Sequence, residues 1–252
     1  IELLKEKRQA VISHAVTKGL NPNAPMKDSG VEWLGEVPEH WLSSRLTYYA
    51  EVGNGSTPKR EHTDYWENGD IPWLNSSKVN DGDIASAEQF VTPKAVKECH
   101  LPWVENGSLL MAITGQGKTR GMVARMRMGA TINQHVASIQ ISREDLNSDF
   151  LYWYLKSQYG RIRFESSDGG STKAAITCDE ITRFPVPVPP RDEQQEIIRF
   201  VETQDEKLAS LSQKSNQQIT FLKERRSALI SAAVTGKIDV RGWQPPANTQ
   251  QQ

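Results

Sequence analysis

Five polar loops carry the side chains of this sequence that are best suited to binding chemistry. Lys, Arg, Ser and Thr suit contacts with phosphate oxygens, and Asn, Gln and Arg have the paired geometry that reads base edges. Turns favour such residues in any protein, so the argument depends on five such loops in one region. The candidates are Ser56, Thr57, Lys59, Arg60, Asn75, Ser77, Lys78, Thr114, Gln116, Lys118, Thr119, Arg120, Asn133, Gln134, His135, Ser171, Thr172 and Lys173.

The distribution of charge supports the same chemistry. The net charge is -1 and the pI about 6.6, which taken alone argues against nucleic acid. The segment 106–143, however, has no acidic residue, and we expect it to form a locally positive surface. The alternative is a strand-rich segment whose polar positions happen to be basic. Its cations are Lys118, Arg120, Arg125, Arg127 and Arg143.

The sequence predicts no catalytic site. Segment 112–119 loosely resembles a P-loop, but Ala112 replaces the first Gly and a strand, not a helix, is expected next. There is no G-x-S-x-G, no H-E-x-x-H and no glycine-rich cofactor loop followed by an acidic residue about 20 positions on. Segment 184–190 lacks the leading Asn or Asp and the closing aromatic of N-P-P-Y, and fits an extended connection better.

Metal, disulfide and membrane chemistry are also not expected. Cys99 and Cys178 cannot form a disulfide framework, and the five histidines lack metal-ligand spacing, with Cys99-His100 an incidental pair. A reducing cytoplasm fits best. The mean hydropathy is -0.58, and no apolar run approaches the roughly 18 residues of a membrane span. Because Ile1 opens within a helical pattern, we expect a fragment of a longer protein.

The loops lie in a region, 21–190, that is predicted to be α+β with a mainly antiparallel or mixed sheet. Strands are expected at Leu109–Ile113, Met122–Met126 and His135–Ile141. A helix is expected at Asp149–Gln158, with Asp149 as its cap. The tryptophans of this region are more typical of core or strand anchors than of base-stacking platforms. They are Trp33, Trp41, Trp66, Trp73, Trp103 and Trp153.

A repeat brackets this region. Residues 1–20 and 219–238 align with an offset of 218 and no gaps, and 11 of the 20 positions are identical. Both copies have apolar residues at helical spacing. Each ends on a glycine, Gly19 or Gly236, which is typical of a left-handed C-terminal cap. The sequence therefore predicts two related helices.

The second copy is predicted to end a helix that runs from Asp192 to Gly236. Pro189 and Pro190 stop the preceding chain, and Asp192 with Gln195 resembles a capping box. Such a helix would be roughly 65 Å long. The polar patch 212–218 interrupts its apolar seam and implies a slip in register.

The apolar stripe of this helix is longer than the first helix can cover. We expect residues upstream of Ile1, or a second copy, to cover the remainder; the alternative is a stripe packed wholly on the chain's own globular region. The interface residues are predicted to be Leu4, Val11, Ile197, Val201, Leu208, Leu211, Ile219, Leu222 and Leu229.

Several of these motifs together resemble one known family. The repeat reads L-K-E-R-R-x-A-L-I-x-A-A-V-T-G, the globular region closes in F-P-V-P-V-P-P-R-D-E-Q-Q-E-I, and the loops read G-S-T-P and I-T-G-x-G-x-T-R-G. This combination resembles the specificity subunits of type I restriction-modification systems. The resemblance implies a globular target-recognition domain similar to that of TaqI-like adenine methyltransferases, with a long projecting helix in an antiparallel coiled coil.

The resemblance also implies an organisation and partners. Residues 1–20 correspond to the end of the central conserved helix, 21–190 to the second target-recognition domain, 191–237 to the distal conserved helix and 238–252 to a tail. The partners would be double-stranded DNA, modification subunits, a restriction subunit and, for this chain, a second copy joined through the long helix. S-adenosylmethionine, ATP and magnesium would belong to the partner subunits. The alternatives are a stand-alone DNA methyltransferase or nuclease, and a coiled-coil adaptor that binds protein.

Overall fold

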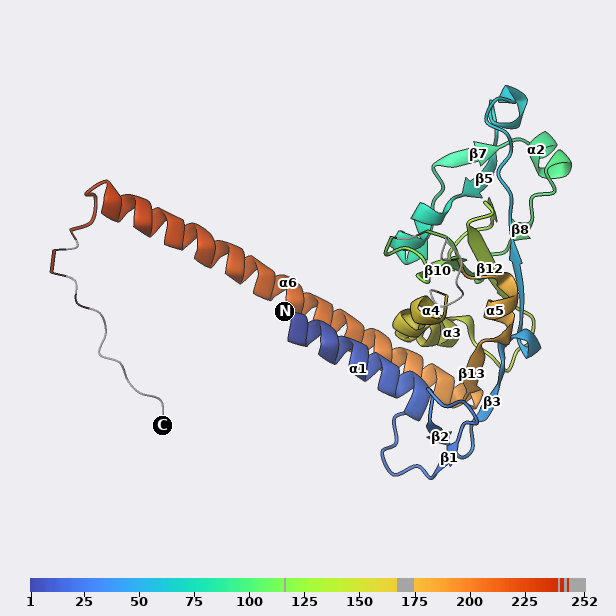
Figure 1. Cartoon of the computed structure of the whole chain (residues 1–252), viewed down its shortest axis with the longest axis horizontal. Coiled ribbons are helices and arrows are strands. Elements are labelled where there is room, and N and C mark those ends of the chain that lie inside the picture. Colours follow the sequence, from blue (N-terminus) through green and yellow to red (C-terminus); the bar gives the residue numbers. More distant parts are fainter. Residues whose placement is uncertain (116, 167–174, 240, 243, 245–252) are drawn as a thin grey trace. The chain divides into compact units, whose positions relative to one another are not determined.

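A computed structural model describes residues 1–115, 117–166, 175–239, 241–242 and 244 (Figure 1). The chain forms two compact units. We call Gln9–Gln204 the globular unit, and we call Ile1–Arg8 together with Asp205–Gln252 the coil unit. Helices α1 (Glu2–Lys18) and α6 (Arg191–Val234) contribute residues to both.

The larger sheet of the globular unit has five strands in the order β4-β12-β9-β10-β6. β12 pairs antiparallel with β4 and β9, β10 pairs antiparallel with β9, and only β6 is parallel to its neighbour. The strands are β4 (Ala50–Asn54), β6 (Asp83–Ile84), β9 (Leu109–Ala112), β10 (Val123–Met126) and β12 (Val136–Ile141). Every residue of β9 is buried, because both faces of this strand are covered.

Successive side chains of β9 point into two different hydrophobic cores, as the period of two in a β-strand requires. Leu109 and Met111 belong to the main core, on the side of α3 and α1. Leu110 and Ala112 belong to a second cluster with Ile84. The expected strands at 109–113, 122–126 and 135–141 are therefore confirmed to within one residue at each end.

A smaller sheet has the order β7-β5-β11-β8. Its strands are β5 (Ile71–Leu74), β7 (Gln89–Val91), β8 (Trp103–Val104) and β11 (Ala130–Ile132), and helix α2 (Pro93–Glu98) packs its Ala95 against Trp73 and Val91. Two two-stranded sheets complete the strands, β1 (Met26–Asp28) with β2 (Glu36–Pro38) and β3 (Leu42–Arg45) with β13 (Pro185–Val188). Because proline has no N–H to donate, the proline-rich β13 suits such an edge position.

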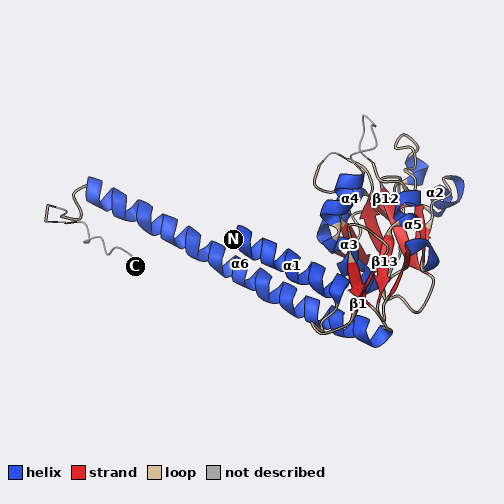
Figure 2. Ribbon diagram, turned by 60° about the horizontal axis from the view of Figure 1, so that its bottom comes forward, coloured by secondary structure: helices blue, strands red, loops and turns tan. Residues whose placement is uncertain are grey.

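Three further helices belong to the globular unit: α3 (Ser148–Ser157), α4 (Tyr159–Glu165) and α5 (Cys178–Arg183) (Figure 2). The predicted helix at 149–158 is α3, but its cap is not Asp149. The side chain of Asn147 accepts a hydrogen bond from the backbone N–H of Asp149, so Asn147 is the N-cap and Asp149 lies in the first turn.

Helix α1 buries Ile12 and Val16, two residues that the predicted interface did not include. Ile12, Ala15 and Val16 are buried in the main core, whereas Val11 is only half-buried. Gly19, which follows α1, has a φ of 77°, and Gly236, which follows α6, has a φ of 73°. The predicted left-handed glycines are therefore confirmed at both ends of the repeat.

The start of α6 is fixed to the globular unit by polar side chains as well as by apolar ones. The buried Gln194 amide accepts from the backbone N–H of Asn147 at 2.8 Å and donates to the carbonyls of Asp145 and Pro189, both at 2.8 Å. Glu193 accepts from Trp41 Nε1 at 3.0 Å. Asp192 follows Arg191 within the first turn and is not the cap that the capping-box pattern predicted.

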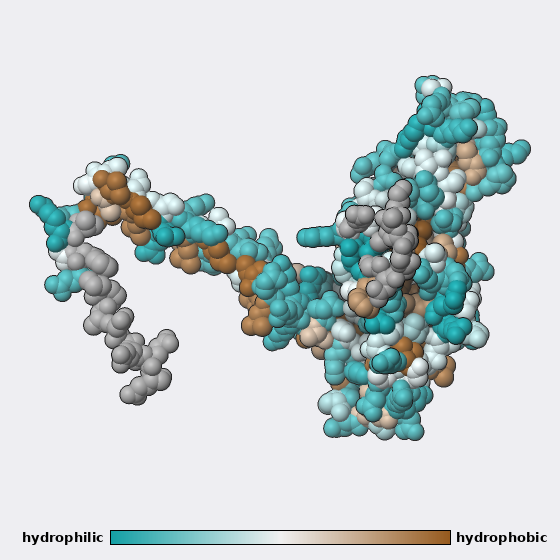
Figure 3. Space-filling view, viewed as in Figure 1, coloured by the Kyte–Doolittle hydropathy of each residue, from teal (hydrophilic) through white to brown (hydrophobic). Residues whose placement is uncertain are grey.

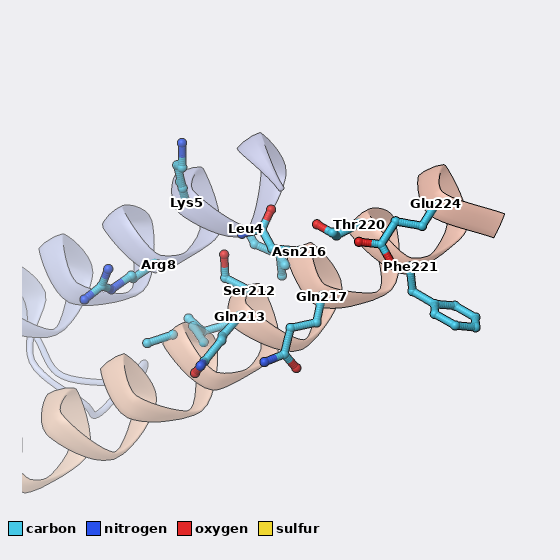
Figure 4. A pocket seen from close by; sticks show the side chains of 12 residues that line it. Leu4, Lys5, Arg8, Ser212, Gln213, Asn216, Gln217, Thr220, Phe221 and Glu224 are labelled. Atoms are coloured by element: carbon cyan, nitrogen blue, oxygen red, sulfur yellow. The ribbon is translucent and has the colours of Figure 1, made fainter. Parts of the chain in front are cut away.

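In the coil unit, the first turns of α1 pack antiparallel to α6. Arg8 donates two hydrogen bonds to the carboxylate of Asp205, at 2.6 and 2.7 Å, and Leu4 lies farther along α6, beside Ser212 and Asn216 (Figure 4). A groove of about 790 Å³ between the two helices is lined in part by the polar patch, through Ser212, Gln213, Asn216 and Gln217. Among the described residues, no helix combines the length and the apolar composition needed to cross a membrane.

Candidate nucleic-acid interface

Three of the five predicted polar loops meet at one place on the globular unit. They are loop 55–60 after β4, loop 113–121 between β9 and β10, and loop 133–135 between β11 and β12; we call them the three-loop site. Gly55 allows loop 55–60 to lie against the backbone at Ile132, since a Cβ at position 55 would lie 1.7 Å from the carbonyl oxygen of Ile132. The backbone N–H of Gly55 donates to the carbonyl of Asn133 at 3.3 Å.

A chain of hydrogen bonds joins side chains of the three loops. Thr57 Oγ1 donates to Gln134 Oε1 at 2.5 Å, and Gln134 Nε2 lies 3.2 Å from His135 Nε2. His135 Nδ1 lies 2.9 Å from Thr114 Oγ1. Gln134 and His135 are both exposed. The structure thus brings one predicted residue from each loop, and a second from loop 133–135, into one polar surface.

Two exposed lysines lie on the same loops as this chain of hydrogen bonds. Lys59 follows Thr57 on loop 55–60, and Lys118 follows Thr114 on loop 113–121. Neither lysine has an ion pair among the residues that the structure describes. The half-buried Thr119 lies close by, with its hydroxyl 3.4 Å from Asn80 Oδ1. The three loops therefore carry exposed amide, hydroxyl and ammonium groups, the types that contact phosphates and base edges.

Side chains of α4 hold loop 113–121 by hydrogen bonds to its backbone carbonyls. The hydroxyl of Tyr159 donates to the carbonyl of Lys118 at 2.6 Å. Arg163 Nη1 donates to the carbonyls of Gly117 at 2.7 Å and Arg120 at 3.0 Å. Sequence reasoning missed both residues, because nothing local marks a helix residue whose partners are carbonyls some 40 positions away in the chain.

Two predicted contact residues are buried instead. Arg120 is 3% exposed, and burial together with the neighbouring Arg163 lowers its pKa. Asn133 is 5% exposed, and its Oδ1 accepts from the backbone N–H of His135 at 3.0 Å, which shapes the loop. Neither side chain reaches a surface that a duplex could touch, so both leave the list of candidate contacts.

The polar side chains of loop 75–78 mainly make contacts close to them in the chain. Asn75 Oδ1 accepts from the backbone N–H of Ser77 at 3.0 Å and from its hydroxyl at 2.5 Å, capping a 3-10 helix. Lys78 is largely covered and forms ion pairs with Asp81 and Glu88. Asn80 of the same 3-10 helix links this loop to the three-loop site, because its Nδ2 donates to the carbonyl of Ser77 at 2.8 Å and its Oδ1 accepts from Thr119 at 3.4 Å.

The remaining candidates divide in the same way. Ser56 Oγ donates to the carbonyl of Cys99 at 3.0 Å. The Arg60 guanidinium stacks 3.6 Å above the centre of the Trp66 ring and hydrogen-bonds to Gln89. Arg60 is exposed, but its guanidinium already has partners within the chain. Gln116, Ser171, Thr172 and Lys173 lie outside the described residues.

The expectation of a positive surface along 106–143 is wrong for most of its cations. Arg125 contacts three carboxylates, those of Asp83 at 2.7 Å, Asp149 at 3.1 Å and Glu202 at 3.2 Å. Burial opposes the charge on Arg125, but hydrogen bonding to Asp83 outweighs it and raises the pKa of the guanidinium. Arg127 shares Asp83 with it, at 2.7 Å.

The other end of the segment is neutralised as well. Arg143 Nη2 lies 3.0 Å from Asp145 Oδ2. The acids come from outside the segment, which is why an acid-free stretch of sequence did not become an acid-free surface. Lys118 is the cation of this segment that is both exposed and outside the ion pairs of the described residues.

The region that resembled a P-loop is a β-hairpin connection. The N–H of Gly121 donates to the carbonyl of Ala112 at 2.8 Å, and the N–H of Ala112 donates to the carbonyl of Met122 at 3.1 Å. β10 follows directly, so the loop does not lead into a helix as a P-loop does. In the described part of the chain, no group of three His, Cys, Asp or Glu residues is placed to hold a metal ion.

The predicted coil residues fall into two sets. Ile197, Val201 and Leu208 are buried, and Leu4 and Val11 are half-buried. The later residues of α6 are exposed, and apolar side chains gather along this part of the helix (Figure 3). These exposed residues are Leu211 at 46%, Ile219 at 41%, Leu222 at 56% and Leu229 at 50%.

Comparison with known families agrees with this architecture. Residues 38–220 match the model of the type I restriction modification DNA specificity domain. This chain belongs to that family. The match covers the three-loop site, the core and the first part of α6.

Named relatives are specificity subunits. The MjaIX specificity subunit of Methanocaldococcus jannaschii is 30% identical over 167 residues, covering 65% of this chain and 38% of the relative. The EcoR124I/EcoR124II specificity subunit of Escherichia coli is 24% identical over 202 residues, covering 79% and 47%. The MjaX subunit of M. jannaschii, 25% identical, is covered to 53%. The chain thus spans about half the length of these relatives, or less.

Solved structures share the fold. The HsdS subunit from Thermoanaerobacter tengcongensis superposes with a TM-score of 0.61 at 18% identity, over 94% of this chain and 52% of that one. A chain from a study of complex assembly in a type I R-M system gives a TM-score of 0.66 at 18% identity, over 92% and 52%. The mixed helix-and-strand fold that the sequence predicted is therefore that of known HsdS subunits.

Proposed function

We propose that this chain is the DNA-reading, non-catalytic part of a type I specificity subunit. In this proposal the globular unit reads one half of a two-part DNA site, and the helices set its distance from a second reading domain. The observation that carries the proposal is the three-loop site, where hydrogen bonds join Thr57, Gln134, His135 and Thr114 on loops that also carry the exposed Lys59 and Lys118. Family membership supports the same conclusion.

The proposed domains follow the repeat. Residues 1–20 are the end of a central helix, 21–190 a target-recognition domain, 191–237 the distal helix and 238–252 a tail. The polar anchors of Gln194 and Glu193 support a junction of recognition domain and helix near residue 190.

The proposed partners are double-stranded DNA, the modification subunits and the restriction subunit of a type I complex. The relatives are named as specificity subunits of type I restriction enzymes, which supports this assignment. S-adenosylmethionine, ATP and magnesium then belong to the partner subunits, and the complex works in the cytoplasm.

The proposed phosphate contacts are Lys59 and Lys118, because ammonium groups on exposed loops suit phosphate oxygens. The test uses the chain assembled with its modification subunit and a duplex that carries the methylated site. Affinity should fall steeply as salt rises, since bound phosphates release counterions. Lys118→Ala should weaken binding to all sequences alike and reduce the salt slope by about 1.

Two results would contradict this proposal. Binding that does not depend on salt or sequence would favour a protein-binding adaptor. DNA cutting or methyl transfer by the chain alone, with magnesium and S-adenosylmethionine but no other subunit, would favour an enzyme.

We also propose that a second copy pairs with α6 through 211–234. The exposed apolar residues along this part of the helix support the proposal, and the Arg8–Asp205 contact supports an antiparallel arrangement. Light scattering of the purified chain should give a dimer, and Leu222→Glu with Leu229→Glu should give a monomer. A strict monomer without these substitutions contradicts the pairing.

A further inference from the structure

We infer that Gln134 is the base-reading residue of the three-loop site and that it reads adenine in the major groove. The inference rests on the proposed DNA-reading function and adds the residue and the base. Its starting point is that Gln134 is exposed while both ends of its amide are already held.

The backbone beneath Gln134 is fixed on every side. The backbone N–H of Asn133 donates to the carbonyl of Leu74 at 3.0 Å, and the carbonyl of His135 accepts from the backbone N–H of Ile113 at 3.0 Å. Asn133 Oδ1 closes the turn by accepting from the N–H of His135. A reading residue works best when its loop is held by rigid elements, because a displaced side chain loses both affinity and discrimination. Loop 133–135 meets this condition.

The amide of Gln134 is also oriented. Its Oε1 accepts from Thr57 and its Nε2 donates to His135 Nε2, so His135 Nδ1–H donates to Thr114. Turning the amide and changing the imidazole tautomer together reverses the direction of this chain but keeps every bond. In either direction Gln134 retains one N–H and one carbonyl lone pair.

These two remaining groups select a base. Adenine presents N7 as an acceptor and N6–H as a donor in the major groove, which matches one donor and one acceptor on adjacent atoms. Guanine presents two acceptors, cytosine a donor, and thymine an acceptor with a methyl group. The hydroxyls of Thr57 and Thr114 are single atoms and cannot make the paired contact. His135 uses both ring nitrogens within the chain of bonds.

The two lysines complete the arrangement. Lys59 and Lys118 lie on the loops that carry Thr57 and Thr114, so the groups that orient Gln134 are on the same loops as the proposed phosphate contacts. Phosphate contacts fix the register of a protein on the duplex, and base contacts then specify sequence. The geometry assigns Thr57 and His135 as positioning residues that act through Gln134.

The experiment uses the chain assembled with its modification subunit. The methylated motif is first determined by sequencing, and Kd is then measured for that duplex and for every single base-pair substitution in it. Gln134→Ala should abolish discrimination at one A·T pair, a loss of about 5- to 150-fold in that one ratio, and leave the ratios at other positions unchanged. Gln195→Ala, an exposed glutamine on α6, is the matched control and should change no ratio.

A second variant tests the chemistry directly. Gln134→Glu removes the N–H donor and keeps acceptors, so preference at the same position should move from adenine towards cytosine, whose N4–H is a donor. His135→Ala should relax discrimination at that position only, and by less than Gln134→Ala.

The outcomes separate the two proposals. If the assembled complex discriminates sequences but Gln134→Ala leaves every ratio unchanged, or lowers all of them equally, the assignment of Gln134 is overturned. If the unaltered complex does not discriminate sequences at all, the proposed function itself fails.

Discussion

The two copies of the repeat are identical at 11 of 20 positions, yet their surroundings differ. Ile12 and Val16 of α1 are 4% and 0% exposed, because they pack in the core of the globular unit. Their counterparts at the end of α6, Ile230 and Val234, are 53% and 82% exposed. Both segments form a helix that ends on a glycine, but a neighbour decides whether the apolar face of the helix is buried.

Polar residues of the repeat follow the same division. Arg8 holds Asp205 with two hydrogen bonds, whereas its counterpart Arg226 is exposed and has no ion pair among the described residues. The same pattern thus forms a packed face in α1 and an exposed apolar face at the end of α6. This comparison is the basis for pairing α6 with a second copy.

The largest effect on stability is expected at an apolar position of the repeat, where Ile12 and Ile230 correspond. Ile12→Ala should lower the free energy of unfolding by about 3 kcal/mol, since it leaves a cavity in the main core. Ile230→Ala, the same change at the matched position, should cost less than about 0.5 kcal/mol in the monomer. Urea unfolding at low protein concentration measures both. Equal costs would mean that the second face is covered in the monomer as well.

The next effect concerns the polar anchor of α6. Gln194→Ala should destabilise the globular unit by about 2 kcal/mol, because it leaves buried partners, including the N–H of Asn147, without a hydrogen bond. Gln217→Ala on the coil unit is the control and should have little effect, since its side chain faces an open groove. Thermal unfolding of the two variants gives the comparison, and a large loss in the control would contradict it.

A smaller effect is expected from the ion cluster that joins β6 and β10 to α3 and α6. Burial acts to raise the pKa of Asp83, but hydrogen bonds from Arg125 and Arg127 outweigh it and hold the pKa below its usual value of 3.8. A lowered pKa stabilises the fold above the unfolded pKa of about 3.9 and loses this contribution as pH falls through the folded pKa.

The unfolding midpoint should therefore fall as pH drops below about 4. In Asp83→Asn this part of the acid dependence should be missing. Urea midpoints measured across the acid range for both proteins test the claim, and parallel curves would refute it.

The smallest effect compares the two arginines of the repeat. Arg8→Ala should cost about 1 kcal/mol or less, because Arg8 is partly exposed and its ion pair with Asp205 is screened by solvent. Arg226→Ala should leave the stability of the monomer unchanged. If the two substitutions had equal effects on the urea midpoint, the pairing of Arg8 with Asp205 would not distinguish the copies.

Local chemistry explains which elements the sequence could predict. Strands β9, β10 and β12 follow from short alternating runs, and the ends of α1 and α6 follow from glycine and proline. The cap of α3 was misassigned because Asn147 and Asp149 are both good caps two positions apart. The buried residues of α1 were only partly predicted: Ile12 and Val16 were left out, because several positions of this helix are apolar and tertiary contacts decide which of them are buried.

Long-range contacts explain what could not be predicted. No local pattern connects Thr57 with Gln134, or Arg125 with Asp83 and Glu202. Loop composition therefore indicated three loops that lie together in the structure, but it could not distinguish the exposed Lys118 from the buried Arg120 two residues away.

Methylated-base sequencing of cells that carry the complete system tests the central claim most directly. The account predicts methylated adenines within a two-part motif. Exchange of residues 21–190 for the matching region of another specificity subunit should change one half of that motif and leave the other half intact. A motif that stays the same after the exchange would contradict the claim that the globular unit reads half of the site.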